Sequence, residues 1–269
     1  MLREVLNRIL GWAASEPMAR HYSLWRKSER LRSVANLERL FFRVVAELDP
    51  KFFIEIGAKT AITSRRARSR APYATIVAFE ANPRNYEKFR HHPRLAEMRV
   101  DYRNVALSDC DGSARFNIVM ANGQLVNGRG SLLDRHSGPR TAEQVEVPCS
   151  RFDSLFDLAY EDDACLWIDV EGANAQVLQG GGQSLARAAA VFIEVEHREK
   201  WHGQWLNDEV TRHFAKAGLV PVARDFQSAH QNNVLFVRQV LLENPMVQMA
   251  LRRYEREAAE GFKGPKLQA

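Results

Sequence analysis

Phe52-Phe53-Ile54-Glu55-Ile56-Gly57 is the stretch of sequence that decides the fold. An apolar run of this length that stops at a glycine predicts a short buried strand followed by a tight turn. The same pattern recurs at Thr75–Phe79 and at Cys165–Ile168, and helical patterns separate these runs. Strands that alternate with helices predict an α/β domain with a doubly wound, mostly parallel sheet and helices on both faces.

Periodicity along the chain divides it into three segments. Residues 1–50 read as an N-terminal helical extension, 51–239 as the α/β domain, and 240–269 as a charged C-terminal helix with a tail. Within the domain, Val145–Pro148 is expected to be a short strand at a sheet edge. Residues 121–144 show little periodicity, and a loop of that length in a compact domain usually covers a ligand.

Composition argues against several classes of protein. The formal net charge of +5 is dispersed along the chain, which does not favour nucleic-acid binding. No apolar run approaches the ~20 residues that span a bilayer. The three cysteines have neither disulfide nor zinc spacing, so we expect no disulfide framework and no structural zinc. A reducing cytoplasm is the expected location.

The first residues of the chain form an amphipathic pattern. Leu2, Val5, Leu6 and Ile9 recur at helical spacing. This helix is expected to pack on the domain or on a second subunit, and contact with a membrane surface is the alternative. Helical segments at both termini also favour a homodimer.

Residues at the strand ends indicate the ligand, because doubly wound sheets bind ligands beyond the carboxyl ends of their strands. Gly57 permits a close backbone turn, and Glu80 follows the second strand, where an acidic residue suits ribose hydroxyls. The dinucleotide pattern G-x-G-x-x-G is absent, since Ala58, Lys59 and Ala61 follow Gly57. A nucleoside without phosphates, such as S-adenosylmethionine, therefore suits this turn better than a dinucleotide.

Five motifs resemble those of a known family. The series is similar to the successive motifs of the FkbM-type methyltransferase family over residues ~50–240 of the chain. This resemblance implies a Rossmann-like class I methyltransferase fold with a seven-stranded, mostly parallel sheet. The motifs are Ile54–Ala58, Val77–Pro83 with Asn85-Tyr86, Asn104–Asp109, Gly130–Leu132 and Trp167–Ala173.

The same resemblance implies an activity and a cofactor site. It implies an S-adenosylmethionine-dependent O-methyltransferase acting on a hydroxyl of a sugar, a glycan or a secondary metabolite. Carried over by position, the residues at the methionine end of the cofactor would be Glu55, Gly57 and Ala58. Those at the ribose would be Glu80 and Ala81, and those at the adenine Asn104, Val105 and Ala106.

Three residues depart from the family pattern. Glu55 stands where Asp is usual, Ala61 replaces the second glycine of the turn, and Lys59 occupies a place that is usually small and polar. These departures raise one alternative, a non-catalytic binding protein on a decayed methyltransferase fold. A nucleic-acid methyltransferase is the other alternative.

Methyl transfer to a hydroxyl requires that donor and acceptor be held in line and that the hydroxyl proton be removed. Asp169 follows one strand and Glu196 and His197 end the next, so these three residues are the predicted catalytic groups. Asp169 would also contact the cofactor. Asp169 and Glu196 would be the ligands if magnesium or another divalent cation were used. The predicted substrate-binding residues are Ser131, Glu171 and Trp201.

Overall fold

The structure is a computed structural model that describes residues 27–121, 124–125, 128–136, 141–156 and 163–261 of the 269-residue chain. The amphipathic pattern at the N-terminus lies outside the described residues, and so do its predicted contacts with a second subunit or a membrane. No helix in the described ranges is long and apolar enough to cross a membrane.

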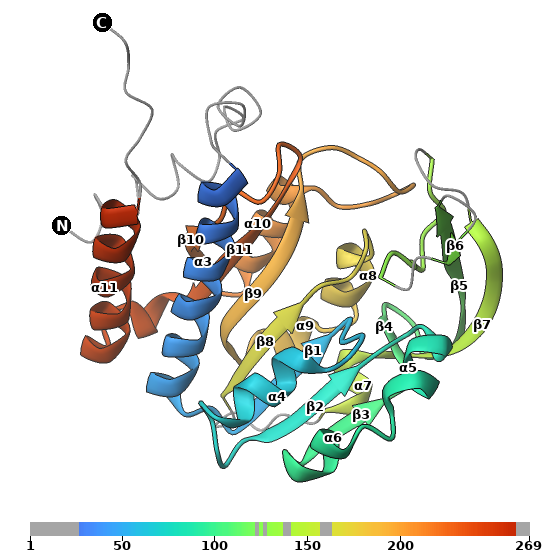
Figure 1. Cartoon of the computed structure of the whole chain (residues 1–269), viewed down its shortest axis with the longest axis horizontal. Helices are drawn as coiled ribbons and strands as arrows, with labels where there is room; N and C mark the ends of the chain where they lie inside the picture. Colours follow the sequence, from blue (N-terminus) through green and yellow to red (C-terminus); the bar gives the residue numbers. More distant parts are fainter. Residues whose placement is uncertain (1–26, 122–123, 126–127, 137–140, 157–162, 262–269) are drawn as a thin grey trace, which may run out of the picture.

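A seven-stranded sheet forms the centre of the molecule (Figure 1). Five neighbouring strands are parallel, and β11 alone runs against its two neighbours. The predicted seven-stranded, mostly parallel sheet is therefore confirmed. In spatial order the strands are β10 (Leu219–Arg224), β11 (Gln231–Arg238), β9 (Ala188–Glu196), β8 (Ala164–Ile168), β1 (Phe52–Ile56), β2 (Thr75–Phe79) and β3 (Val100–Arg103).

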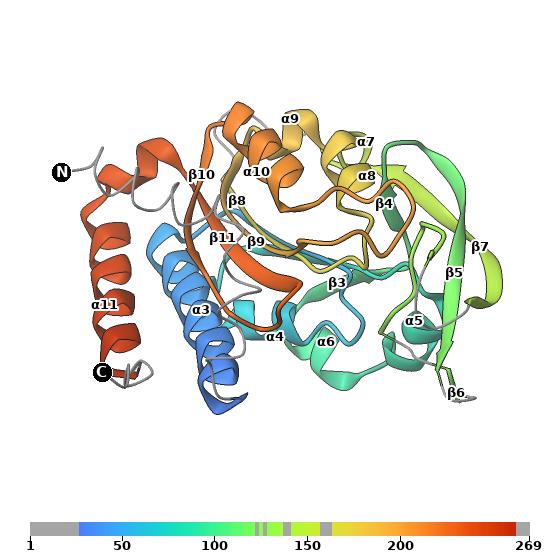
Figure 2. The same cartoon turned by 90° about the horizontal axis from the view of Figure 1, so that it is seen from above.

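Helices cover both faces of this sheet, as Figure 2 shows. The layer on one face contains α3 (Lys27–Leu48), α4 (Ile62–Arg68), α5 (Pro83–Phe89) and α6 (Pro93–Glu97). The layer on the other face contains α7 (Phe152–Leu155), α8 (Asn174–Gln179), α9 (Gly182–Leu185) and α10 (Asn207–Lys216).

Side chains of the central strands alternate between these two layers, as the two-residue period of a strand requires. On β1, Phe53 belongs to the core beneath α3, whereas Ile54 and Ile56 belong to the core beneath α7–α10. Burial on both faces explains why β1 reads as a continuous apolar run. Glu55 shares a face with Phe53, so its side chain points toward the layer of α3 and α4.

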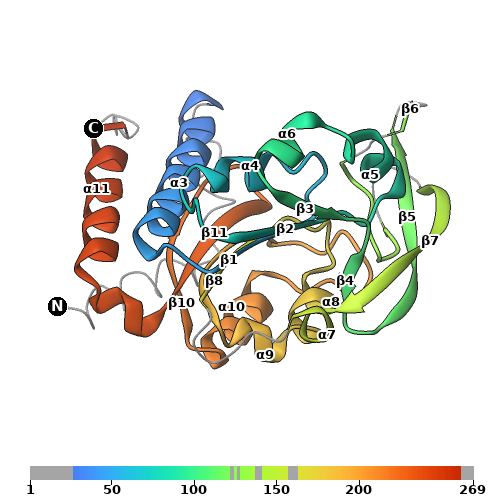
Figure 3. The same ribbon diagram turned by 90° about the horizontal axis from the view of Figure 1, so that it is seen from below.

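A second sheet extends from the β3 end of the main sheet (Figures 1 and 3). Its strands, in spatial order, are β4 (Ala106–Ser108), β7 (Thr141–Arg151), β5 (Gly112–Ala121) and β6 (Gln124–Leu125). The strand predicted at Val145–Pro148 is part of the longer strand β7, and only β5 pairs with these four residues, so they lie at an edge of the sheet as expected. Proline is tolerated there because β4 pairs only from Cys149 onward, so Pro148 has a partner strand on one side.

The long helix α3 and the C-terminal helix α11 (Pro245–Gly261) lie side by side at the end of the molecule opposite the second sheet (Figure 2). The apolar stripe of α3 is fully buried against the main sheet. A short 3-10 helix, η2 (Gln239–Glu243), precedes α11. Pro245 begins α11 because the first position of a helix needs no N–H donor.

Candidate active site

A pocket with a cavity volume of about 460 Å³ opens at the carboxyl ends of β1, β2, β8 and β9. Its size falls within the ~300–1,000 Å³ typical of small-molecule sites. The strand order reverses between β1 and β8, and this is the switch point at which doubly wound sheets bind ligands. We call one part of the pocket the β2 side (Glu80, Asn82, Val105 and Leu107) and the other the β9 side (Asp169, Glu171, Glu194 and Lys200).

Gly57 joins the two sides. Its amide donates to the Phe79 carbonyl at 2.9 Å, while the Asp169 amide donates to the Ile56 carbonyl at 2.9 Å. A Cβ on Gly57 would lie 1.9 Å from the Asp169 carbonyl oxygen, and the residue has a φ of +85°. The glycine is therefore required by the close approach of β8 to the turn after β1, in addition to its contact with the pocket.

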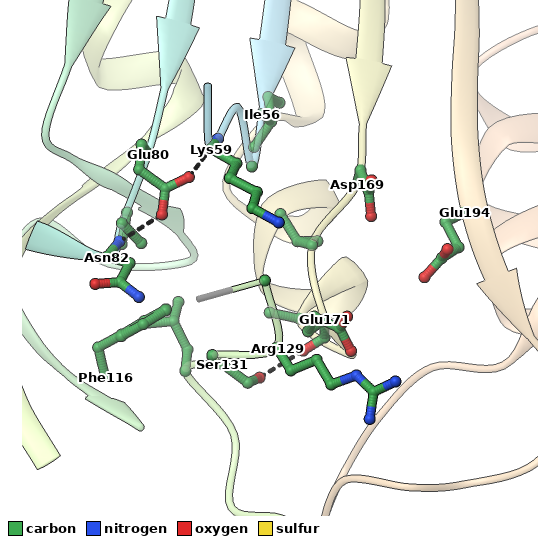
Figure 4. A pocket seen from close by; sticks show the side chains of 18 of the residues that line it. Ile56, Lys59, Glu80, Asn82, Phe116, Arg129, Ser131, Asp169, Glu171 and Glu194 are labelled. Atoms are coloured by element: carbon green, nitrogen blue, oxygen red, sulfur yellow. Dashed lines mark hydrogen bonds between the residues drawn. The ribbon is translucent and has the colours of Figure 1, made fainter. Parts of the chain in front are cut away.

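Glu80 is the central polar group of the β2 side (Figure 4). Its carboxylate accepts hydrogen bonds from the Lys59 amide at 2.6 Å, the Asn82 amide at 2.9 Å and the Asn85 side-chain amide at 3.2 Å. Burial raises the pKa of Glu80, and these donors oppose the shift. Because a carboxylate has about four acceptor sites, roughly one remains for a ligand hydroxyl.

Other predicted cofactor residues fall into two groups. Ala81, Val105 and Ala106 line the pocket with Gly57, Glu80 and Asp169, whereas Glu55, Ala58 and Asn104 lie behind it. The buried Glu55 carboxylate accepts the Ser64 amide at 2.7 Å, in the first turn of α4. The Asn104 side chain donates to the Glu80 carbonyl at 2.8 Å. Glu55 and Asn104 thus hold the pocket loops in place, because their polar groups bond to protein backbone.

Carboxylates gather on the β9 side. Ile168 pairs with Ile193 in the sheet, so Asp169 and Glu194 follow paired residues, and both line the pocket (Figure 4). Asp169 is open to the pocket, but the surrounding protein desolvates it and raises its pKa, an effect that the Lys59 ammonium opposes. Burial, followed by the charges of neighbouring carboxylates, raises the pKa of Glu194 well above its usual 4.5.

Lys200 and Gln231 connect this cluster to Glu196. Gln231 donates its side-chain amide to Glu194, and Lys200 Nζ donates to Gln231 Oε1 at 2.8 Å. Lys200 Nζ also lies 3.8 Å from Glu196 Oε1. Burial raises the pKa of Glu196 to about 7, and Lys200 opposes that shift. Glu196 itself does not line the pocket. Its contact with the pocket is indirect, because Lys200, which lies beside Glu196, is a lining residue.

The loop that carries Ser131 is fixed to both sheets. Ser131 and Asn117 exchange two backbone hydrogen bonds, at 2.8 and 3.1 Å, and Ser131 Oγ donates to the Glu171 carbonyl at 2.5 Å (Figure 4). A Cβ on Gly130 would lie 2.5 Å from the Phe116 ring, so Gly130 is required by packing. Ser131 and Glu171 both line the pocket, and their contact with the substrate stays a prediction.

Two further predicted residues lie outside the pocket lining. Trp201 is completely buried beneath Gly172, with the Arg135 guanidinium 4.7 Å from its ring centroid. The prediction that Trp201 contacts substrate is therefore corrected, because a fully buried ring offers no surface to a ligand. The His197 ring is hydrogen-bonded to the Asn232 side chain. His197 therefore has no direct access to the pocket, contrary to its predicted catalytic role.

Among the acidic residues that end β9, sequence reasoning chose Glu196 and not Glu194 as a site residue, and it missed Lys200 and Gln231 as pocket residues. A signal for Glu194 was present, because residues two apart on a strand share a face and Glu196 had already been singled out. Lys200 and Gln231 come from the loop after β9 and the start of β11, and no local pattern relates these positions. The described residues contain no group of three or more His, Cys, Asp or Glu side chains suited to a metal ion.

A seven-stranded sheet of this order, with one antiparallel strand and a pocket at its switch point, defines the class of Rossmann-like class I methyltransferases. The model of the methyltransferase FkbM domain matches residues 55–221, which is more than half of the chain. The chain therefore belongs to the FkbM methyltransferase family and is an S-adenosylmethionine-dependent methyltransferase.

Several individual proteins are similar to this chain. The 2-O-methyltransferase NoeI of Sinorhizobium fredii is 24% identical over 181 residues, which cover 64% of this chain and 74% of NoeI. Methyltransferase FkbM from Methylobacillus flagellatus is 10% identical with a TM-score of 0.46, over 70% of this chain and 44% of that one. This chain thus spans less than half of that protein. Sp1610 of Streptococcus pneumoniae, a putative tRNA (m1A22) methyltransferase solved with S-adenosyl-L-methionine, is 11% identical with a TM-score of 0.40, over 81% and 87% of the two chains.

The residues of the pocket fit S-adenosylmethionine. The β2 side combines a carboxylate that retains an acceptor site with apolar side chains from Phe79, Val105 and Leu107. A hydroxyl-bearing ribose and a flat adenine require this combination. Among the described residues, the turn after β1 forms no cradle of successive glycines for a pyrophosphate, since Lys59 and Ala61 follow Gly57.

Proposed function

We propose that this methyltransferase transfers a methyl group to a hydroxyl oxygen of a sugar or a glycan. The observation that carries the proposal is the cluster of Asp169, Glu171 and Glu194 in the same pocket as the predicted ribose acceptor Glu80. Carboxylates accept hydrogen bonds from hydroxyl groups, and several on one side of a pocket suit a polyhydroxylated acceptor. The name of the relative NoeI, a 2-O-methyltransferase, supports the same class of reaction.

Asp169 is the residue proposed to accept the hydroxyl proton. When bound, S-adenosylmethionine supplies an activated methyl group, so the protein must orient the acceptor and remove one proton. Desolvation raises the pKa of Asp169, which makes it a stronger base than an ordinary aspartate. The Lys59 ammonium opposes this shift.

Glu171 and Glu194 are proposed to orient the acceptor. Both line the pocket next to Asp169, and both have pKa values raised by burial and then by the charge of Asp169. Carboxyls with raised pKa values can be protonated, so they can donate as well as accept hydrogen bonds to hydroxyls.

Purified protein incubated with S-adenosylmethionine and a panel of sugars, sugar nucleotides and oligosaccharides tests this proposal. We expect release of S-adenosylhomocysteine with at least one hydroxylated acceptor and a methyl ether in the product by mass spectrometry and NMR. The analogue of that acceptor lacking the methylated hydroxyl should be inert. A methyl group on nitrogen or carbon, or turnover of the deoxy analogue at the same rate, would contradict the proposal.

A further inference from the structure

The Lys59 ammonium is a positive charge in the pocket, and no acidic side chain of the described residues forms an ion pair with it. It follows Ala58 in the turn after β1 and lines the pocket between Glu80 and Asp169 (Figure 4). Its backbone is fixed at both ends, since its amide donates to Glu80 Oε2 at 2.6 Å and its carbonyl accepts the Tyr102 hydroxyl at 2.6 Å. Within the described ranges its ammonium makes no hydrogen bond and no ion pair.

The backbone of Lys59 is held in an unfavourable conformation. Its φ of +47° lies in the left-handed region, as does the φ of +50° at Ala61. This region disfavours any residue with a Cβ, and a strained non-glycine residue at a ligand site points to a role for its side chain. A glycine at this position would relieve the strain and lose only the side chain.

The side chain of Lys59 extends across the pocket. Its Nζ lies 2.9 Å from the place that a Cβ on Gly128 would take, on the loop facing the β1 turn. Burial raises the pKa values of both Glu80 and Asp169, and the Lys59 ammonium opposes both shifts, so its charge acts on the two sides of the pocket.

The chemistry of the methyl donor leaves one group for this charge to bind. Adenine and ribose carry no negative charge, and the sulfonium is itself positive. The α-carboxylate at the methionine end is the single anionic group of the molecule. We propose that the Lys59 ammonium pairs with this carboxylate and thereby sets the position of the methionine end. This inference rests on the donor site described above.

Binding calorimetry with S-adenosylhomocysteine and with its decarboxylated analogue tests the assignment. In Lys59→Met the dissociation constant for S-adenosylhomocysteine should rise about ten-fold or more, as expected for loss of a charge-assisted hydrogen bond. The decarboxylated analogue, which is positively charged, should bind the variant as well as the wild type or more tightly. Lys88→Met, at an exposed lysine of α5, is the matched control and should change neither constant.

Lys59→Arg should restore most of the affinity for S-adenosylhomocysteine because it restores the cation. Equal losses for both ligands in Lys59→Met would overturn the proposal, since a merely structural role affects them alike. An unchanged constant for S-adenosylhomocysteine, with a raised KM for the acceptor, would overturn it in favour of an acceptor contact. If the wild type binds neither ligand, the donor site itself is wrong, and this inference falls with it.

Discussion

The β2 side and the β9 side of the pocket satisfy their carboxylates in different ways. Glu80 on the β2 side accepts three hydrogen bonds from its own chain, so its position is fixed before any ligand arrives. On the β9 side, burial raises the pKa values of Asp169, Glu171 and Glu194, and the charge of a neighbouring carboxylate or of Lys59 acts on each of them. This difference in hydrogen bonding supports the proposed division of the pocket, in which the β2 side holds the donor and the β9 side receives the acceptor.

The largest expected effect comes from removing the proposed base on the β9 side. Asp169→Asn should lower kcat by roughly 10²–10⁴-fold, the usual contribution of general base catalysis. Its dissociation constant for S-adenosylhomocysteine should change by no more than about three-fold, or ~0.7 kcal/mol. Initial rates and calorimetry measure the two quantities. Asp163→Asn, just before β8, is the matched control, and full activity in Asp169→Asn would refute the assignment of the base.

A second substitution disrupts the contact between the turn after β1 and Asp169, which connects the two sides of the pocket. Gly57→Ala places a Cβ 1.9 Å from the Asp169 carbonyl and requires a left-handed φ of +85°. We expect a loss of about 2–5 kcal/mol in the free energy of unfolding, from backbone strain and overpacking together. Gly218→Ala is the control, because its φ of +76° is similar but nothing lies within 4 Å of the added Cβ.

Chemical denaturation separates these two contributions. Gly218→Ala should lose only the backbone part, about 1–2 kcal/mol. Equal losses in the two variants would show that the contact between the β1 turn and β8 is not tight, and that the two sides are not joined as described.

The sequence predicts those features of the structure that depend on neighbouring residues, and it does not predict contacts between residues that are distant in the chain. The β1, β2 and β8 runs predict the main sheet because burial on both faces leaves a local signature in each strand. Gly57 was predicted as a turn, yet its contact with Asp169 joins residues distant in the chain and leaves no local pattern. The full burial of Trp201 depends in the same way on Gly172 and Arg135.

The burial of Glu196, which lies outside the pocket lining, should appear in the pH dependence of stability. Burial raises the pKa of Glu196 from 4.5 to about 7, so the folded state retains a proton that the unfolded state has lost between these values. The contribution of Glu196 is therefore fully present below pH 4.5 and is lost as the pH rises through 7. Its size is at most about 3.4 kcal/mol, from 1.36 kcal/mol per pKa unit.

Glu196→Gln should reduce this fall in stability, measured by urea denaturation at a series of pH values. Glu146→Gln, at an exposed position on β7, is the control and should leave the pH profile unchanged. An unaltered profile in Glu196→Gln would contradict this prediction, because it would mean that the pKa of Glu196 is the same in the folded and unfolded states.

The division of the pocket into a donor side and an acceptor side is tested most directly by the affinity for S-adenosylhomocysteine of two matched variants. Glu80→Gln places an amide against the backbone amides of Lys59 and Asn82, and its dissociation constant should rise roughly ten-fold or more. Glu194→Gln should leave that constant within about three-fold and instead lower kcat/KM for the acceptor. With both variants shown by thermal unfolding to be folded, a larger loss of donor affinity in Glu194→Gln than in Glu80→Gln would contradict the account.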